Sequence, residues 1–152
     1  MLVYRITKSK HASDISGTGS ALHPGRWNKK GTPVLYTGEN KEIALLEYIV
    51  HIPAMMTPQL DLLTIEIPDD SITELKIKDL PINWHQFPAP AILSEIGQEW
   101  IEEGKTIALK VPSSIIHSSH NIILNCNHKD YSKKVKLLDQ KKFHLDTRFT
   151  KG

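Results

Sequence analysis

The strongest secondary-structure signals lie between Gly31 and Pro53, where the sequence reads GTPVLYTGENKEIALLEYIVHIP. Its first half predicts a strand over residues 33–37, because apolar and β-forming residues lie between two glycines. Its second half predicts a helix from Lys41 to about residue 51, since Asn40 is a favoured N-cap and the proline cannot continue the helix. The apolar arc of this helix comprises Ile43, Leu46, Ile49 and Val50. A strand that passes directly into an amphipathic helix therefore forms the centre of the expected domain.

Around this centre, predicted strands outnumber predicted helices. Alternating or apolar runs predict strands over residues 2–6, 62–67, 73–77, 106–111 and 121–124, and weaker ones over 135–138 and 143–145. One further helix is expected over residues 91–103, stopped by Gly104, with an inward face of Ile92, Leu93, Ile96 and Trp100. Because strands and helices do not alternate regularly, the sequence predicts an α+β fold and not a doubly wound α/β fold.

Two segments between these elements predict loops. The run from Ser16 to Gly25 is rich in glycine and serine and predicts a mobile polar loop. The run from Pro81 to Pro88 contains prolines and aromatic residues, which favours a packed loop able to form one wall of a pocket.

Composition bounds the class of protein. At 152 residues the chain fits one compact domain, 1–152, without internal repeats. A hydrophobic fraction of 39% and a charged fraction of 24% argue against both disorder and membrane spanning. No apolar run suits a signal segment or a membrane helix, and the lone Cys126 fits a reducing compartment. We therefore expect a cytoplasmic protein with no membrane partner.

The charge distribution gives little support for nucleic-acid binding. The net charge is only +2, whereas domains that bind nucleic acid usually carry a strongly basic face. The segment from Lys129 to Lys151 is locally basic, with eight lysines and arginines against three aspartates. We interpret it as a solvated face or a partner-docking edge, and expect no direct contact with nucleic acid.

Three residues near the central stretch carry the chemistry. Arg26 follows a Pro-Gly turn, and its planar fork suits the two oxygens of a pyrophosphate. Tyr36 ends the predicted strand, where its ring could stack on a base or nicotinamide. Glu47 lies at the edge of the apolar arc, where a carboxylate can stabilise the positive charge that develops when a glycosidic bond breaks. Taken singly, each has a structural alternative: an arginine stacked on Trp27, a core tyrosine, and a border glutamate paired with a lysine.

Other polar residues predict supporting roles at most. Ser113 follows a strand, but no Gly-x-Ser-x-Gly elbow surrounds it, so orienting Glu47 or a ligand is more plausible than nucleophilic attack. The spacing of His117, His120, Cys126 and His128 matches no strong zinc pattern. We therefore expect no metal and no bound cofactor.

Together these segments resemble the RES family of bacterial toxins, which is named for an arginine, a glutamate and a serine. The resemblance covers most of the chain and rests on the order of its motifs: Tyr4-Arg5, Gly25-Arg26-Trp27-Asn28, Gly31–Thr37, Ala44-Leu45-Leu46-Glu47, Leu109–Ser113 and Asn121–Asn125 with His128. It implies a compact fold like that of ADP-ribosyltransferases, with a mixed sheet core and flanking helices.

The resemblance also implies an activity and a partner. NAD would be the substrate, cleaved at the nicotinamide–ribose bond by a glycohydrolase or phosphorylase reaction that depletes the cell of NAD and inhibits growth. By match to the family motifs, the catalytic residues would be Arg26, Tyr36, Glu47 and Ser113. Arg26 and Tyr36 would also bind NAD, together with Trp27 and Asn121. The partner would be a cognate antitoxin with an Xre-like DNA-binding region, and a homodimer within the toxin–antitoxin complex stays open.

Rival functions stay open at this point. The same site could transfer ADP-ribose to a protein, although such transferases often carry an acid two positions before the catalytic glutamate, and Leu45 stands there. A non-enzymatic module that docks through its basic C-terminal segment would bind in a salt-dependent manner without consuming NAD. A nuclease built from the histidines would need a metal.

Overall fold

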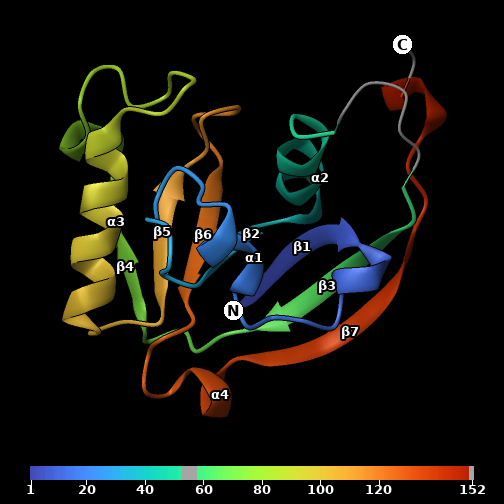
Figure 1. Ribbon diagram of the computed structural model, residues 1–152, viewed down its shortest axis with the longest axis horizontal. Helices are drawn as coiled ribbons and strands as arrows, with labels where there is room; N and C mark the ends of the chain where they lie inside the picture. The colour runs from blue at the N-terminus through green and yellow to red at the C-terminus, as the bar shows by residue number, and fades with distance from the viewer. Residues whose placement is uncertain (53–57, 151–152) are drawn as a thin grey trace.

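The computed structural model describes residues 1–52 and 58–150, in which seven strands form one mixed sheet in the order β4-β5-β6-β2-β1-β3-β7 (Figure 1). Strands β4 and β5 are parallel, and all other neighbours are antiparallel. The strands are β1 (Leu2–Lys8), β2 (Val34–Gly38), β3 (Leu60–Glu66), β4 (Ile72–Glu74), β5 (Ala108–Pro112), β6 (His120–Asn125) and β7 (Lys136–Phe143). The mixed sheet with few helices confirms the predicted α+β fold.

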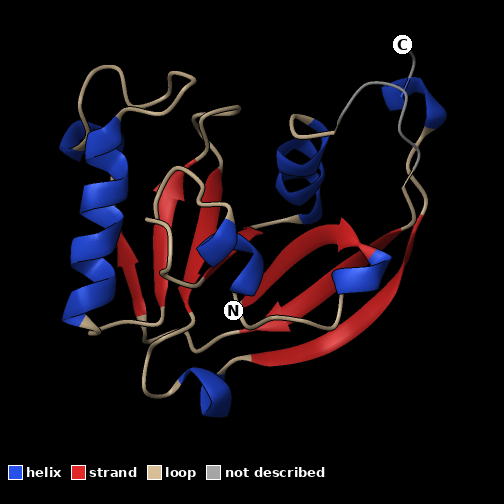
Figure 2. Ribbon diagram, viewed as in Figure 1, coloured by secondary structure: helices blue, strands red, loops and turns tan. Residues whose placement is uncertain are grey.

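Two helices of more than two turns accompany the sheet (Figure 2). Helix α2 (Lys41–Ile49) begins as predicted, because the side-chain oxygen of Asn40 accepts a 2.8 Å hydrogen bond from the Ile43 N–H. Helix α3 (Ala91–Glu103) ends at Gly104, whose φ of 63° lies in the left-handed region. Shorter helices are α1 (Thr18–Leu22) and α4 (Tyr131–Lys134), and single 3₁₀ turns occupy Ser9–His11, Ile77–Asp79 and Thr147–Thr150. None of the helices in the described ranges is long and apolar enough to span a bilayer.

The two faces of the sheet carry separate hydrophobic clusters. Alternation along β2 shows this, because Leu35 belongs to one cluster while Val34 and Tyr36 belong to another. The Leu35 face is closed by the segment around Ala12 and by α4. The opposite face is covered by α3 over β5 and β6 and by α2 over β1 and β3. In Figure 1 these two helices stand on either side of the central strands, so part of this face lies between them.

The contact between α3 and the loop before β2 is close enough to need a glycine. A Cβ atom on Gly97 would lie 1.8 Å from the backbone oxygen of Trp27. The Trp27 side chain is 3% exposed and packs in the same cluster as Leu93 and Trp100 of α3. This contact sets the position of Arg26, the adjacent residue in the loop.

Several predicted elements are wrong in extent. The weak strands at 135–138 and 143–145 form one strand, β7, at the edge of the sheet; its side chains are mostly exposed, so it lacks an apolar period. The loop at 16–25 contains α1, and the strand predicted at 73–77 is limited to β4. Helix α2 ends at Ile49, and Pro53 lies outside the described residues.

The predicted inward faces of the two long helices also need correction. Helix α3 buries Leu93, Gly97, Trp100 and Ile101, whereas Ile92 is 46% exposed. Helix α2 buries Ile43 and Ala44, whereas Val50 is 58% exposed. In both helices the buried arc is rotated toward a small residue, because an alanine or glycine lets the helix approach its neighbour closely.

Candidate active site

Tyr36 lies on β2 with its ring on the face between α2 and α3. Its hydroxyl donates to the side-chain oxygen of Asn28 at 2.6 Å and accepts from the Trp27 backbone N–H at 3.0 Å. Burial raises the pKa of Tyr36, so the hydroxyl stays protonated at neutral pH. Because the hydroxyl is occupied within the protein, the ring is the part that can contact a ligand. The alternative of a core tyrosine with a surface hydroxyl therefore does not describe this residue.

Asn28 organises the loop that precedes β2, a role that sequence reasoning missed. It is 1% exposed, and its side-chain oxygen also accepts from the Gly25 N–H at 2.8 Å. Its side-chain nitrogen donates to the carbonyls of Ser20 and Thr32 at 2.9 and 3.0 Å. One buried amide thus fixes both ends of the loop that carries Arg26. The one available signal was its place directly after Arg-Trp in the family motif.

Arg26 extends from that loop toward the segment that precedes α3. Its Nη1 donates to the carbonyls of Trp84 and Gln86 at 2.7 and 3.1 Å. Burial lowers the pKa of Arg26, whereas the nearby Glu47 carboxylate and Tyr36 hydroxyl raise it. The guanidinium is half-buried, and in the described part of the chain its other nitrogens make no hydrogen bond, so an anion can contact them. It does not lie on the indole of Trp27, which is buried beneath α3.

Glu47 lies on α2, half-buried and facing the same space. Burial raises the pKa of Glu47, and His51, Asn121, Arg26 and Ser113 oppose that shift. Among the residues that the structure describes, no lysine forms an ion pair with it, so the border-glutamate alternative is not supported. When ionised, a carboxylate in this position is poorly solvated by its surroundings and interacts strongly with a cation brought beside it.

Ser113 and Asn121 approach Glu47 from the central strands. Ser113 is 0% exposed at the end of β5, and its hydroxyl oxygen accepts from the Ile115 and Ile116 N–H groups at 3.1 Å each. The hydroxyl proton is therefore left for another acceptor, and interaction with Ser113 and Asn121 lowers the pKa of Glu47. Asn121 lies on β6, opposite Gly38 of β2 and Val111 of β5. Arg26, Tyr36, Glu47, Ser113 and Asn121 thus converge, and Trp27 supports them from the core.

Arg5 is a second arginine that contacts this site, from the opposite face of the sheet. Strands β1 and β2 pair through Tyr4 and Gly38, beyond which they diverge. The Nη1 of Arg5 spans the opening and donates to the backbone oxygen of Tyr36 at 2.8 Å. Burial lowers the pKa of Arg5, and Cys126, Tyr131 and Asp14 raise it. In the sequence this residue stands out only as part of the Tyr4-Arg5 motif.

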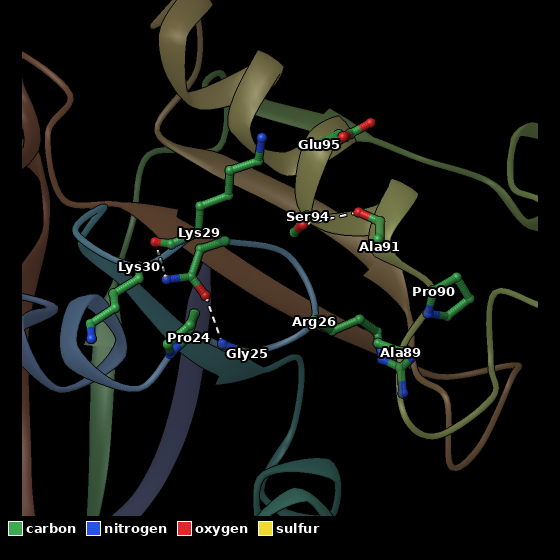
Figure 3. Close-up of a pocket in the computed structure, with 11 residues that line it drawn as sticks. Pro24, Gly25, Arg26, Lys29, Lys30, Ala89, Pro90, Ala91, Ser94 and Glu95 are labelled. Carbon is green, nitrogen blue, oxygen red and sulfur yellow. Dashed lines mark hydrogen bonds between the residues drawn. The ribbon is translucent and has the colours of Figure 1, made fainter.

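A cavity of about 490 Å³ lies beside Arg26, between its loop and the first turn of α3 (Figure 3). The polar residues that line it are Arg26, Asn28, Lys29, Lys30, Ser94 and Glu95. In Figure 3 the Arg26 side chain extends toward Ala89, at one end of the cavity. Arg26 therefore borders both this cavity and the space that Glu47 faces.

Comparison with known proteins identifies the family. A model described as the RES domain matches residues 2–146. The chain belongs to the RES domain family. It is 38% identical to Toxin Res of Photorhabdus laumondii, over 100% of this chain and 99% of that protein. It is 30% identical to the Prs ADP-ribosylating toxin of Sphingobium sp., over 93% of this chain and 89% of that protein.

A solved structure shares the fold of this RES domain. A chain in the crystal structure of the M.tuberculosis MbcT-MbcA toxin-antitoxin complex superposes with a TM-score of 0.79 at 16% identity. The superposition covers 94% of this chain and 84% of that one. The compact mixed sheet is therefore shared across a large sequence distance.

The histidines and Cys126 of this RES domain have separate partners. His120 contacts the Glu39 carboxylate at 3.0 Å, and His128 accepts from the Asp130 N–H at 3.0 Å. His117 packs on Trp84, and burial raises the pKa of Cys126 to about 11. No group of three or more metal-ligating side chains occurs within residues 1–52 and 58–150.

Proposed function

We propose that this RES domain is the toxin of a toxin–antitoxin system and consumes NAD by breaking its nicotinamide–ribose bond. The observation that carries the proposal is Glu47, a half-buried carboxylate that shares one space with Arg26, Ser113 and the ring of Tyr36. A dinucleotide can be bound by an anion-binding group and a flat ring, and a carboxylate can stabilise the positive charge that develops on its ribose when the glycosidic bond breaks. The toxin role is supported by the name of the Photorhabdus relative and by the complex that contains the fold neighbour.

In the proposed reaction, binding precedes bond breaking. The free nitrogens of Arg26 hold the pyrophosphate, and its bonds to the Trp84 and Gln86 carbonyls keep the guanidinium in place. The ring of Tyr36 stacks on the nicotinamide, and its hydroxyl bonds to Asn28 and Trp27 fix the ring plane. Preorganised groups of this kind contribute to rate because they need no rearrangement during the reaction.

The bond between the ribose C1′ and the nicotinamide nitrogen then breaks. Its electron pair leaves with nicotinamide, and positive charge develops on the ribose. Glu47 stabilises this charge, while Ser113 and Asn121 keep the carboxylate oriented. The oxygen of water or of inorganic phosphate attacks C1′, which yields ADP-ribose or its phosphorylated form, and the proton of the nucleophile passes to solvent. No step requires a metal or a further cofactor.

The partner and compartment belong to the same proposal. A toxin that depletes NAD acts in the cytoplasm and must be held inactive by a cognate antitoxin, here expected to carry an Xre-like DNA-binding region. The fold neighbour was crystallised in a toxin–antitoxin complex, which supports a partner of this kind. Whether two copies of this chain meet within such a complex is tested by the mass of the purified assembly.

The test is release of nicotinamide from NAD by the purified protein. We expect wild type to release it and Glu47→Gln to be slower by about 10²–10³-fold, as for loss of one charge-stabilising group. Glu42→Gln is the matched control, because Glu42 is exposed in the first turn of the same helix and should cleave NAD like wild type. Wild type that leaves NAD intact, with water or phosphate present, would refute the proposal.

ADP-ribosylation of a protein is the second candidate, favoured by the name of the Sphingobium relative, Prs ADP-ribosylating toxin. The position two residues before Glu47 is Leu45, which packs against the α2 cluster and supplies no second acid. Incubation of a cell extract with NAD labelled in its adenosine half separates the two. Label that stays in small molecules supports NAD breakdown, and label attached to one protein supports transfer.

A further inference from the structure

Three aromatic rings meet next to the backbone carbonyls that Arg26 contacts, and the proposed reaction leaves these rings unused. The ring centroid of Trp84 lies 5.0 Å from that of His117 and 5.6 Å from that of His85. The two imidazoles are 5.1 Å apart. We call Trp84, His85 and His117 the ring cluster. Trp84 is 3% exposed, whereas both imidazoles are exposed, so the cluster has a buried base and an open face.

The ring cluster is tied to two residues of the site. Arg26 donates to the carbonyls of Trp84 and Gln86, one on each side of His85. His117 lies in the turn that begins with Ser113, whose hydroxyl holds the N–H groups of Ile115 and Ile116. The loop that carries His85 and the turn that carries His117 are therefore each hydrogen-bonded to a residue of the site.

The loop that carries Trp84 and His85 also exposes apolar side chains. Phe87 is 88% exposed and Ile82 is 96% exposed, although large apolar side chains usually avoid such exposure in clusters. An aromatic surface near an arginine provides a flat face for stacking and a positive charge for binding an anion. Nucleotides combine the complementary features, a flat base and a phosphate.

We propose that the exposed face of the ring cluster stacks on the adenine base of the dinucleotide. The inference rests on the proposed function, since it places the adenosine half of NAD next to the pyrophosphate held by Arg26. In NAD the adenine is joined to the pyrophosphate through a single ribose, so it lies one sugar away from the phosphate-binding group. The backbone bonds of Arg26 to residues 84 and 86 hold the rings at a fixed place relative to that group. Stacking on imidazole uses the flat face of the ring and needs no hydrogen bond to the base edge.

The test compares NAD with nicotinamide mononucleotide, which has the same scissile bond and one phosphate but no adenosine. For the double variant His85→Ala/His117→Ala we expect kcat/KM for NAD to fall roughly ten- to hundredfold, chiefly through KM. For nicotinamide mononucleotide we expect no change. His117→Phe keeps a flat ring and should retain the preference for NAD. His144→Ala, which changes an exposed histidine outside the ring cluster, is the matched control.

A binding measurement separates this inference from the proposed function. Calorimetric titration with AMP should show at least tenfold weaker binding to the double variant, while ribose 5-phosphate should bind both proteins equally. Loss of AMP affinity in a protein that cleaves no NAD would support the base site and refute the proposed reaction. An equal fall in kcat/KM for NAD and nicotinamide mononucleotide would overturn the base site, because the rings would then only position Arg26 and Ser113. Unchanged AMP binding would also overturn it, and the exposed rings would then serve a protein partner.

Discussion

Glu47 is less stable as a carboxylate in the folded protein than in water. Burial is the largest influence and raises its pKa, and Arg26, Ser113, Asn121 and His51 only partly restore the charged form. A raised pKa means that the folded state favours the protonated acid. The stability due to this group is therefore present below the pKa of the unfolded chain and is lost as pH rises through the folded value.

The raised pKa of Glu47 predicts opposite changes in stability and activity for Glu47→Gln. The variant should unfold at a higher temperature than wild type at neutral pH, and the difference should disappear below about pH 4, where the glutamate is protonated in both states. Activity should change in the opposite direction, because the amide cannot stabilise the ribosyl cation. Melting curves at several pH values measure the stability, and an NAD-cleavage assay measures the activity. A variant that is less stable than wild type at neutral pH would contradict the description of Glu47 as a poorly solvated carboxylate.

The wild-type pH profile follows from the same residue. The reaction needs Glu47 charged, and its pKa is raised, so the acidic limb of kcat/KM should lie above the ordinary glutamate pKa of about 4.3. A profile that stays flat down to that value would show that protonation of Glu47 does not limit the reaction.

Tyr36 separates the function of a ring from that of its hydroxyl. Tyr36→Phe keeps the ring but leaves the buried Asn28 oxygen and the Trp27 N–H with one partner fewer. We expect the free energy of unfolding to fall by about 1–3 kcal/mol in urea titrations. Tyr48→Phe is the control: its hydroxyl has no hydrogen-bond partner among the described residues, and its loss should cost under about 0.5 kcal/mol. Equal effects of the two changes would argue against the network around Asn28.

At the scale of elements, the fit of α3 against the Arg26 loop depends on one glycine. Gly97→Ala would place a methyl group on the Trp27 backbone oxygen, so helix and loop must separate. We expect a loss of about 3 kcal/mol or more and a parallel loss of NAD cleavage, because Arg26 moves with the loop. Gly19→Ala in α1 meets no atom within 4 Å and should instead stabilise by about 0.5–1 kcal/mol. Chemical denaturation of both variants measures the contrast.

The elements also show what the sequence could and could not predict. Helix α2 began after Asn40 and helix α3 ended at Gly104, as the cap and stop residues indicated, since these signals act within a few residues. Strand β7 was predicted as two fragments, because an edge strand with one partner needs no continuous apolar face. In the site, motif order indicated Arg26 and Glu47. The Asn28 network and the ring cluster were not predicted, because each joins loops whose paths depend on tertiary contacts.

At the scale of the whole molecule, the charge distribution bears on the rival function of a binding module. Three lysines of the basic segment, Lys136, Lys141 and Lys142, are exposed on β7 at the edge of the sheet, and Lys142 reaches Asp61 at 3.7 Å. This placement agrees with a solvated or docking edge. These lysines lie on β7 beside β3, whereas the site residues lie on β2, β6, α2, the loop before β2 and the turn after β5, so the edge and the site can act separately.

The two parts of the sheet meet beside the site. Four strands from β4 to β2 form one part and β1, β3 and β7 the other, and the two parts meet at the Tyr4–Gly38 pair. Arg5 bridges the opening beyond that pair through its bond to the Tyr36 backbone oxygen. Replacing Arg5 with methionine preserves most of the side-chain volume but removes the donor. We expect a loss of about 1.5–3 kcal/mol of unfolding free energy, the usual size of a hydrogen bond from a charged group.

The effect of Arg5→Met on activity tests whether Arg5 only supports the site or takes part in catalysis. Within the described residues the hydrogen bond of Arg5 goes to the backbone of Tyr36, so Arg5→Met should raise KM for NAD through a less well-held ring and leave the acidic limb of the pH profile unchanged. Arg5→Lys, which keeps a donor of nearly the same reach, should recover much of both stability and KM. If Arg5→Met instead abolished kcat while the protein stayed folded, the arginine would have to contact the substrate, and the opening between β1 and β2 would be part of the active site.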